Sequence, residues 1–352
     1  MSKWNFNQEL LEIAIEKGQS FLLSSGLSKQ DKRDIKSDIK RFQLFLAGDF
    51  DDIERKRYQN MPYLKNNILS GMKKMEKVLS PELRTWLINL CMAKLFEVDN
   101  EIPIFNMDFD EISRETLKNY KKYAPVLYNF AHFMLKRKNP GLIQSAALNT
   151  SSYCFYSDIL RLPFMVIDPL DDASSLNHEM EHGIEYLINA NQHPFYGEFG
   201  PIYFEMLFCD GLYNKYGQSS LAMHLTRMDD ATNQLNILTV YLCAMRIFAK
   251  HNYEVSDQLF LETFANLKNI NNEKLLIFLN DEIVNVNIVE TINYLLSFLR
   301  SIEVRELTMK DNNMAGVIFN DTLFKNRFKF HIPDDNYKLY ERYVSEIKQK
   351  MR

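Results

Sequence analysis

The stretch SSLNHEMEHGIEYLI, residues 174–188, holds two of the seven histidines of the chain. His178 and His182 are four residues apart, and Glu179 directly follows the first of them. The stretch also carries an apolar stripe with helical spacing, formed by Leu176, Met180, Ile184, Leu187 and Ile188. It therefore predicts a helix that packs into a core and presents both imidazoles on one face.

The pattern His-Glu-x-x-His is typical of a metal site that contains a base. Residues i and i+4 lie one above the other on a helix, so His178 and His182 can reach one ion. Glu179 is turned aside from the pair, where it can take a proton from a water molecule. Zn²⁺ accepts two nitrogens and one oxygen and leaves a fourth position for water. Two surface histidines on an acidic helix would give the same letters, so the pattern alone is a hypothesis.

The third ligand is expected to be an acid on a later helix. The stretch GEFGPIYFEMLFCDG offers Glu198 in a Gly-flanked segment and Glu205 in an apolar helical run. An unpaired carboxylate is costly to bury, and either a metal ion or a charge partner such as Arg227 would offset that cost. We expect Glu205 to be the ligand. Asp210 could hold the far nitrogen of a ligating histidine or could cap a helix.

The rest of the chain predicts a mainly α-helical fold. Gly and Pro are few, 11 and 10 of 352 residues, which disfavours an all-β sandwich with many tight turns. Ser80 and Pro81 predict a helix start, and Pro125 predicts a break between two helices. Runs rich in aromatic and β-branched residues at 153–156 and 164–167 predict a small antiparallel hairpin just before the histidine helix.

Two regions are expected along the chain. Pro140 and Gly141 interrupt the helical pattern, so we place a boundary near residue 138. Residues 1–138 would form an N-terminal helical region, and residues 139–352 would form the region that carries the metal site.

Composition excludes several classes of function. The net charge of −4 predicts neither a nucleic-acid groove nor attachment to an anionic membrane. No apolar run is long enough to span a membrane, and the N-terminus does not resemble a signal peptide. The cysteines contain no C-x-x-C pair and are expected to be reduced, as in a cytoplasmic protein. They are Cys91, Cys154, Cys209 and Cys243.

These residues resemble the thimet oligopeptidase and oligoendopeptidase F family of zinc metallopeptidases. Members carry H-E-x-G-H-x-x-H on one helix and a metal-binding Glu about two dozen residues later; here Glu205 follows His182 by 23 residues. The linking stretch INANQHPFYGEFGPIYFE and the hairpin before the histidine helix are also similar. The resemblance covers roughly residues 140–310.

The resemblance implies a zincin-like, mostly helical body that encloses a cleft or channel in which short peptides are cleaved. His178, His182 and Glu205 would bind Zn²⁺, and Glu179 would activate water. Tyr294 would donate its phenolic hydrogen to the developing oxyanion, although a tyrosine at this apolar helix position is also typical of a core. The strand at 152–157 would offer backbone groups to an extended peptide.

Two positions depart from the family pattern. Glu181 stands where the family has Gly, and Glu185 stands where it has a further His. Neither position is needed for metal ligation, but a carboxylate at 181 would tighten the metal or raise the pKa of Glu179. The sequence thus predicts a zinc metallopeptidase. The alternative is a catalytically weak or inactive peptidase-like protein that binds peptides or a partner. The substrate sequence and the oligomeric state are not predicted.

Overall fold

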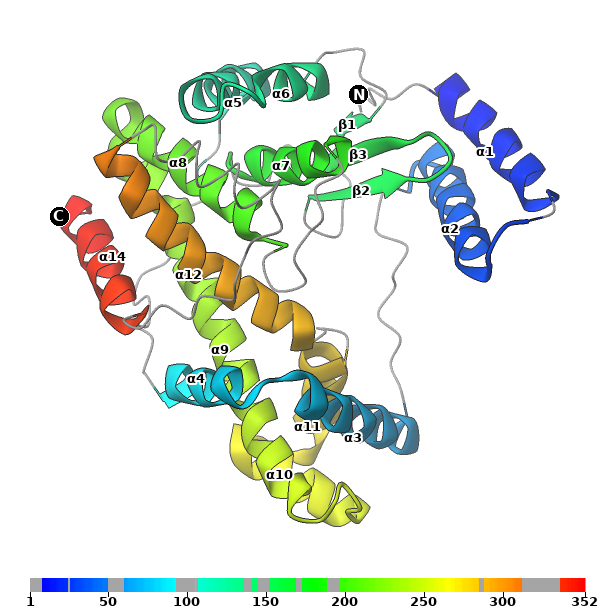
Figure 1. Cartoon of the computed structure of the whole chain (residues 1–352), viewed down its shortest axis with the longest axis vertical. Coiled ribbons are helices and arrows are strands. Elements are labelled where there is room, and N and C mark those ends of the chain that lie inside the picture. Colours follow the sequence, from blue (N-terminus) through cyan, green and yellow to red (C-terminus); the bar gives the residue numbers. More distant parts are fainter. Residues whose placement is uncertain are drawn as a thin grey trace.

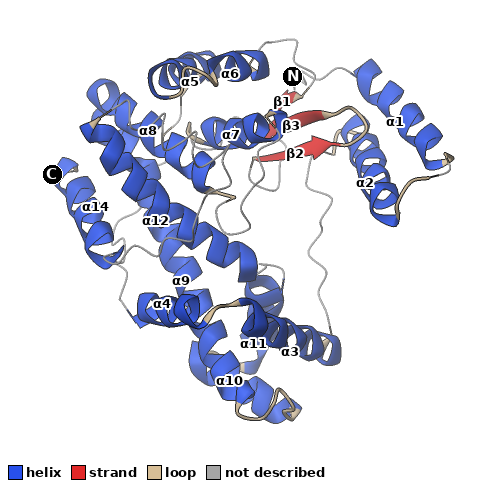
Figure 2. Ribbon diagram, viewed as in Figure 1, coloured by secondary structure: helices blue, strands red, loops and turns tan. Residues whose placement is uncertain are grey.

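The computed structural model describes residues 8–24, 26–49, 60–92, 105, 107–135, 141–144, 152–168, 173–188, 197–284, 288–311 and 336–351. Within them the protein is built mainly from α-helices, with one small sheet near the middle of the chain (Figure 1, Figure 2). The expected mainly α-helical class with a small sheet beside the histidine helix is confirmed.

The helices follow one another along the chain with few strands between them. They are α1(Gln8–Leu22), α2(Lys29–Leu46), α3(Met61–Val78), α4(Pro81–Met92), α5(Phe109–Tyr123), α6(Tyr128–Met134), α7(Ser175–Leu187), α8(Phe199–Tyr216), α9(Ala222–Ala249), α10(Asp257–Lys268), α11(Asn272–Phe278), α12(Ile288–Lys310) and α14(Asn336–Lys350), with a 3-10 segment η1(Gly217–Leu221) and a π-helical segment η2(Leu279–Val284).

Two expected helix boundaries are confirmed. Ser80 accepts a hydrogen bond through its Oγ from the backbone N–H of Leu83, at 3.1 Å, and α4 begins at the following Pro81. Such a cap satisfies one of the N–H groups that the first helical turn leaves unpaired. Pro125 lies between the end of α5 and the start of α6, as expected for a residue that disfavours helix in the position before it.

The sheet contains three strands, β1(Leu142–Gln144), β2(Tyr153–Ser157) and β3(Leu162–Ile167), in the order β1-β3-β2. The antiparallel pairing of β2 with β3, expected from the sequence, joins Phe155 to Phe164 and Tyr153 to Val166. The parallel strand β1 was not expected. It has only three residues, too few for an alternating pattern to be recognised.

The strand β3 separates two apolar clusters because its side chains alternate between the two faces of the sheet. Phe164 and Val166 pack with the hairpin of α1 and α2. Met165 and Ile167 belong to the larger core that contains α7 and α8. In Figure 1 the sheet accordingly lies with α1 and α2 to its right and α7 alongside β3.

Helix α8 is the centre of the larger core and packs against α5, α7, α9 and α12. It is apolar almost all round, as expected of a fully buried helix. Two acids, Glu205 and Asp210, nevertheless lie within it, and each of them forms an ion pair with an arginine.

Residues from before and after residue 138 share both apolar clusters. Helices α1 and α2 pack on the sheet, while α3 and α4 pack on α9. The division into regions 1–138 and 139–352 stays a prediction.

Candidate functional site

The two histidines of α7 lie on one face of the helix, as the spacing predicts. Their imidazole centroids are 5.0 Å apart. The side chains retain 12% and 16% exposure, so both rings are largely buried. Met180 and Ile184, on the opposite face, are fully buried in the larger core and hold the helix in place. The histidine pair is therefore fixed by the packing of α7.

A carboxylate from the start of α8 lies between the two imidazoles. Glu198 is the residue just before α8, and its Oε2 is 3.2 Å from His178 Nε2 and 3.4 Å from His182 Nε2. Among the described residues, these three side chains form a cluster whose possible ligand atoms all lie within 4.8 Å of one another.

The donor set and its distances fit a tetrahedral zinc site. Two ligands bound at about 2.0–2.2 Å with tetrahedral angles lie about 3.3–3.6 Å apart. The distances from Glu198 to the two histidines, 3.2 and 3.4 Å, are close to that value. Two neutral imidazoles and one carboxylate are also the ligands of many catalytic zinc sites. The residues present therefore suit Zn²⁺.

Glu205 lies on the other side of the His178 ring. Its Oε2 is 3.3 Å from His178 Nδ1, and its carboxylate accepts two hydrogen bonds from Arg227, at 2.7 and 2.8 Å. The Ser174 hydroxyl donates to Glu205 Oε1 at 3.4 Å. Glu205, the expected third ligand, thus contacts Nδ1 of one histidine, whereas Glu198 lies beside Nε2 of both.

The reason lies in the periodicity of α8. Glu198 and Glu205 are seven residues apart, which is about two helical turns, so both acids face α7. They meet His178 from opposite sides, one at Nε2 and one at Nδ1. A spacing of seven between two acids is the sequence signal that would have placed both beside the histidine helix.

The electrostatics of this cluster reflect close packing of opposite charges. Burial alone would lower the pKa of His178, but the carboxylates of Glu205 and Glu198 outweigh it and raise the pKa to about 10. Burial would raise the pKa of Glu205, but Arg227 and His178 lower it to about 2. Glu198 likewise has its pKa held well below the usual range despite burial, because His182 and His178 lie beside it. The cluster favours bound positive charge between its carboxylates.

Glu179 is buried beside the histidines, with 8% exposure. Burial raises its pKa, and the nearby charges of Glu198 and Glu205 act in the same direction, whereas His178 and His182 oppose them. A carboxylate with a raised pKa accepts and returns a proton near neutral pH more readily than an ordinary one. Its environment is therefore suited to proton transfer.

Tyr294 lies on α12 and does not adjoin the histidine pair directly. Its hydroxyl donates to Asp230 Oδ2 at 3.3 Å and accepts from Arg227 Nη1 at 3.5 Å. Arg227 in turn contacts Glu205. The expected role of Tyr294 as an oxyanion donor stays a prediction.

The two acids that depart from the family pattern are buried on the side of α7 that faces α8. Tyr120 donates a hydrogen bond to Glu181, and burial together with Glu185 raises the pKa of Glu181 to about 8. A methyl group placed on Gly200 would lie 2.5 Å from Glu185 Oε1 and 3.1 Å from Glu181 Cγ. The first turn of α8 therefore approaches these acids as closely as a glycine allows.

Asp210 has neither of the roles considered for it. It lies inside α8, so it caps no helix, and it accepts hydrogen bonds from Arg305 at 2.6 and 2.9 Å. Its histidine neighbour is His224 on α9, which is not part of the metal motif.

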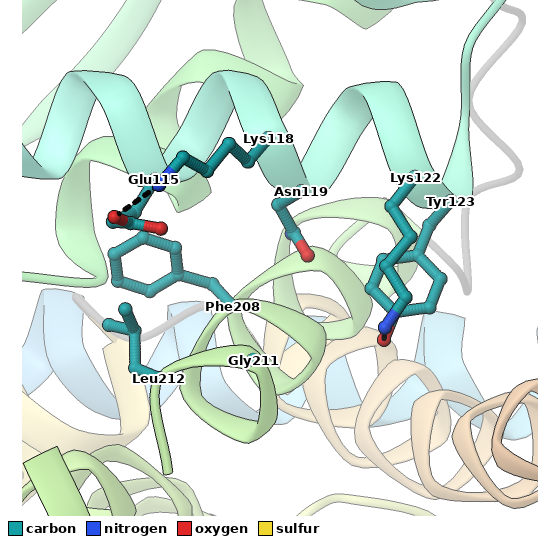
Figure 3. Close-up of a pocket in the computed structure, with 8 residues that line it drawn as sticks. All are labelled: Glu115, Lys118, Asn119, Lys122, Tyr123, Phe208, Gly211 and Leu212. Carbon is teal, nitrogen blue, oxygen red and sulfur yellow. Dashed lines mark hydrogen bonds and ion pairs between the residues drawn. The ribbon is translucent and has the colours of Figure 1, made fainter. Parts of the chain in front are cut away.

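Figure 3 shows a pocket of about 190 Å³ between α5 and α8. Its lining includes Lys118 and Asn119 from α5 and Phe208 and Gly211 from α8. None of the residues discussed for the metal site lines it.

Two solved structures resemble the chain in three dimensions. The first, described as an oligoendopeptidase F, is 14% identical with a TM-score of 0.50, over 92% of this chain and 65% of that one. The second, described as an oligoendopeptidase F from Bacillus anthracis str. Ames, is 14% identical with a TM-score of 0.45, over 98% and 67%. No protein-family model and no curated protein matches the sequence.

The chain shares the fold of the first structure. The resemblance expected from the sequence is thus confirmed at the level of the fold. The chain spans 65% of the length of that structure. Among its described residues, no helix combines the length and apolar character needed to cross a membrane.

Proposed function

We propose that the protein is a zinc-dependent metallopeptidase that hydrolyses short peptides. The observation that carries this proposal is the meeting of two imidazoles and one carboxylate at distances that suit one tetrahedral ion, with Glu179 buried beside them. The shared fold with an oligoendopeptidase F supports the choice of a peptide as substrate.

His178 and His182 would hold the metal through their Nε2 atoms, and Glu198 would hold it through Oε2. Glu198 replaces Glu205 in the ligand set because it lies within 3.4 Å of both Nε2 atoms. Zinc, when bound, would polarise the scissile carbonyl and acidify a water molecule. Glu205 serves instead as the acceptor for His178 Nδ1–H and so orients the ring.

Glu179 acts as the general base. It takes a proton from the attacking water and passes it to the leaving amine. Its raised pKa suits both the uptake and the release of that proton. Its position directly after His178 keeps it next to the ligands without making it one.

Strand β2 would position the peptide. It forms one edge of the sheet, packs against α7, and pairs on its outer side with no described strand. An extended peptide can add to such an edge through backbone hydrogen bonds, largely independent of its sequence. This arrangement favours flexible peptides over folded proteins.

The test is zinc analysis of the purified protein followed by Glu179→Gln. We expect about one zinc per chain, zinc-dependent cleavage of short peptides, and a loss of about 100- to 10,000-fold in cleavage rate in the variant with zinc retained. Zinc without any cleavage in the unaltered protein would instead support a peptide-binding protein. A chain that binds no zinc would contradict the proposal.

A further inference from the structure

We propose that Arg227 is a positioning residue of the metal site: it fixes Glu205, and through Glu205 it turns the Nε2 of His178 toward His182 and Glu198. This inference rests on the proposed function. Arg227 would touch neither metal nor substrate, so its effect is on ligand geometry.

The contact between Arg227 and Glu205 is bidentate. Arg227 Nε donates to Oε2 at 2.8 Å, and Nη2 donates to Oε1 at 2.7 Å. A guanidinium that pairs both nitrogens with both oxygens fixes the plane of the carboxylate as well as its distance. Glu205 is fully buried, so without this partner its charge would be strongly unfavourable.

Glu205 in turn determines which nitrogen of His178 carries hydrogen. A neutral histidine that ligates a metal through Nε2 must have its proton on Nδ1, and that N–H needs an acceptor. Glu205 Oε2 lies 3.3 Å from Nδ1, at ion-pair distance, and is the carboxylate placed to accept from it. Arg227 Nη2 is 3.4 Å from the same Nδ1, but a guanidinium has no lone pair to accept from it. The Glu205 carboxylate contacts both Arg227 and His178.

The third guanidinium nitrogen of Arg227, Nη1, also forms hydrogen bonds. Nη1 donates to Asp230 Oδ2 at 3.2 Å and to the Tyr294 hydroxyl at 3.5 Å. The guanidinium therefore links α9 and α12 to the carboxylate on α8 and the histidine on α7. Lysine has one nitrogen and no planar fork, so it could supply the charge but not this geometry.

The experiment compares Arg227→Lys with Arg305→Lys. Arg305 is a matched control because it pairs bidentately with Asp210, which lies on α8 like Glu205. Arg305 contacts no residue of the metal site. Zn²⁺ affinity would be measured by competition with a chromophoric chelator, and the ¹H and ¹⁵N shifts of the His178 Nδ1–H group would report its contact with Glu205 in the zinc-loaded protein. We expect Arg227→Lys to weaken Zn²⁺ binding by about 10- to 100-fold and to shift the Nδ1–H signals of His178, with no change for Arg305→Lys.

A second variant guards against loss of folding. Glu205→Gln combined with Arg227→Met removes both buried charges together, so it leaves neither charge without its partner. It should fold and still bind Zn²⁺ about 10- to 100-fold more weakly. Zn²⁺ affinity equal to that of the unaltered protein in the folded variants would overturn this inference and leave the proposed function standing. An unaltered protein that binds no Zn²⁺ would overturn both.

Discussion

Two buried acids of α8, Glu205 and Asp210, form similar ion pairs with different consequences. Near its start, Glu205 lies between Arg227 and His178; one turn and a half later, Asp210 lies between Arg305 and His224. In both places a buried acid is held by a bidentate arginine and adjoins an imidazole.

The difference lies in what the histidine does with its other nitrogen. His178 directs Nε2 to Glu198 beside a second histidine. His224 is fully buried, and its Nδ1 meets the hydroxyl of Tyr343 at 2.8 Å. A buried acid next to a histidine therefore does not identify a metal site by itself. The proposed metal site rests instead on the pair of partly exposed imidazoles with a shared carboxylate.

The largest expected effect belongs to the second ion pair. Arg305→Met would leave Asp210 buried without its main partner and should lower the free energy of unfolding by about 3–5 kcal/mol. Urea unfolding measures this, and chelator competition below the transition should show unchanged Zn²⁺ affinity. Weakened Zn²⁺ binding in the folded variant would mean that the Arg305–Asp210 ion pair is coupled to the metal site.

Glu198→Ala tests the ligand assignment at the start of α8. Removing a ligand should weaken Zn²⁺ binding by more than about 100-fold, because even the loss of a group behind a ligand costs about 10- to 100-fold. Asp210→Asn is the control at the other end and should leave the affinity unchanged. If Glu205→Gln instead abolished Zn²⁺ binding while Glu198→Ala retained it, Glu205 would be the ligand after all.

The two glycines of α8 offer a comparison that changes no charge. Gly200→Ala would bring a methyl group to 2.5 Å from Glu185 Oε1, whereas nothing lies within 4 Å of the equivalent position on Gly211. We expect Gly200→Ala to destabilise the fold by about 1–3 kcal/mol and to weaken Zn²⁺ binding by shifting Glu198. Gly211→Ala should stabilise α8 by up to about 1 kcal/mol. Thermal unfolding of both variants measures the contrast, and equal behaviour would contradict it.

The smallest effect expected is a pH dependence confined to the metal site. With the pKa of His178 raised to about 10, its ring is protonated in the metal-free protein at pH 7. Zn²⁺ must displace the Nε2 proton, so affinity should rise about tenfold per pH unit for each proton released between pH 6 and 8.

The raised pKa of His178 makes the stability of the metal-free fold fall with rising pH, whereas Zn²⁺ affinity rises. In the metal-free protein, the pairing of His178 with its carboxylates stabilises the fold fully below pH 6.5, the ordinary pKa of histidine, and is lost as pH rises toward 10.

Calorimetry of Zn²⁺ binding in buffers of different ionisation enthalpy would count the protons that Zn²⁺ releases. Asp210→Asn should show the same slope of affinity with pH. A Zn²⁺ affinity that is independent of pH would contradict the assignment.

The sequence predicted elements whose signals are local. The apolar stripe of α7, the Ser80 cap and the strands β2 and β3 each depend on residues close together in the chain, and all are present. Strand β1 is defined by its pairing with β3 some twenty residues away, so its three residues carry too little pattern of their own.

The site was predicted less completely for a related reason. Burial of Glu205 could be inferred from its apolar surroundings, but metal and arginine satisfy a buried carboxylate equally well, and Arg227 comes from a different helix. Glu198 is at the start of α8, and the first turn of that helix packs closely on α7 through Gly200 against Glu181 and Glu185. The spacing of seven places both acids on the side of α8 that faces α7, but it does not tell which of them reaches both imidazoles.

The most direct measurement is the anomalous diffraction of zinc-loaded crystals collected at the zinc edge. The proposed ligand set predicts one peak, with Nε2 of His178, Nε2 of His182 and a carboxylate oxygen of Glu198 each about 2.0–2.2 Å away. Glu205 should remain paired with Arg227 behind the His178 ring. A peak coordinated by Glu205 in place of Glu198, or no peak at this site, would contradict it.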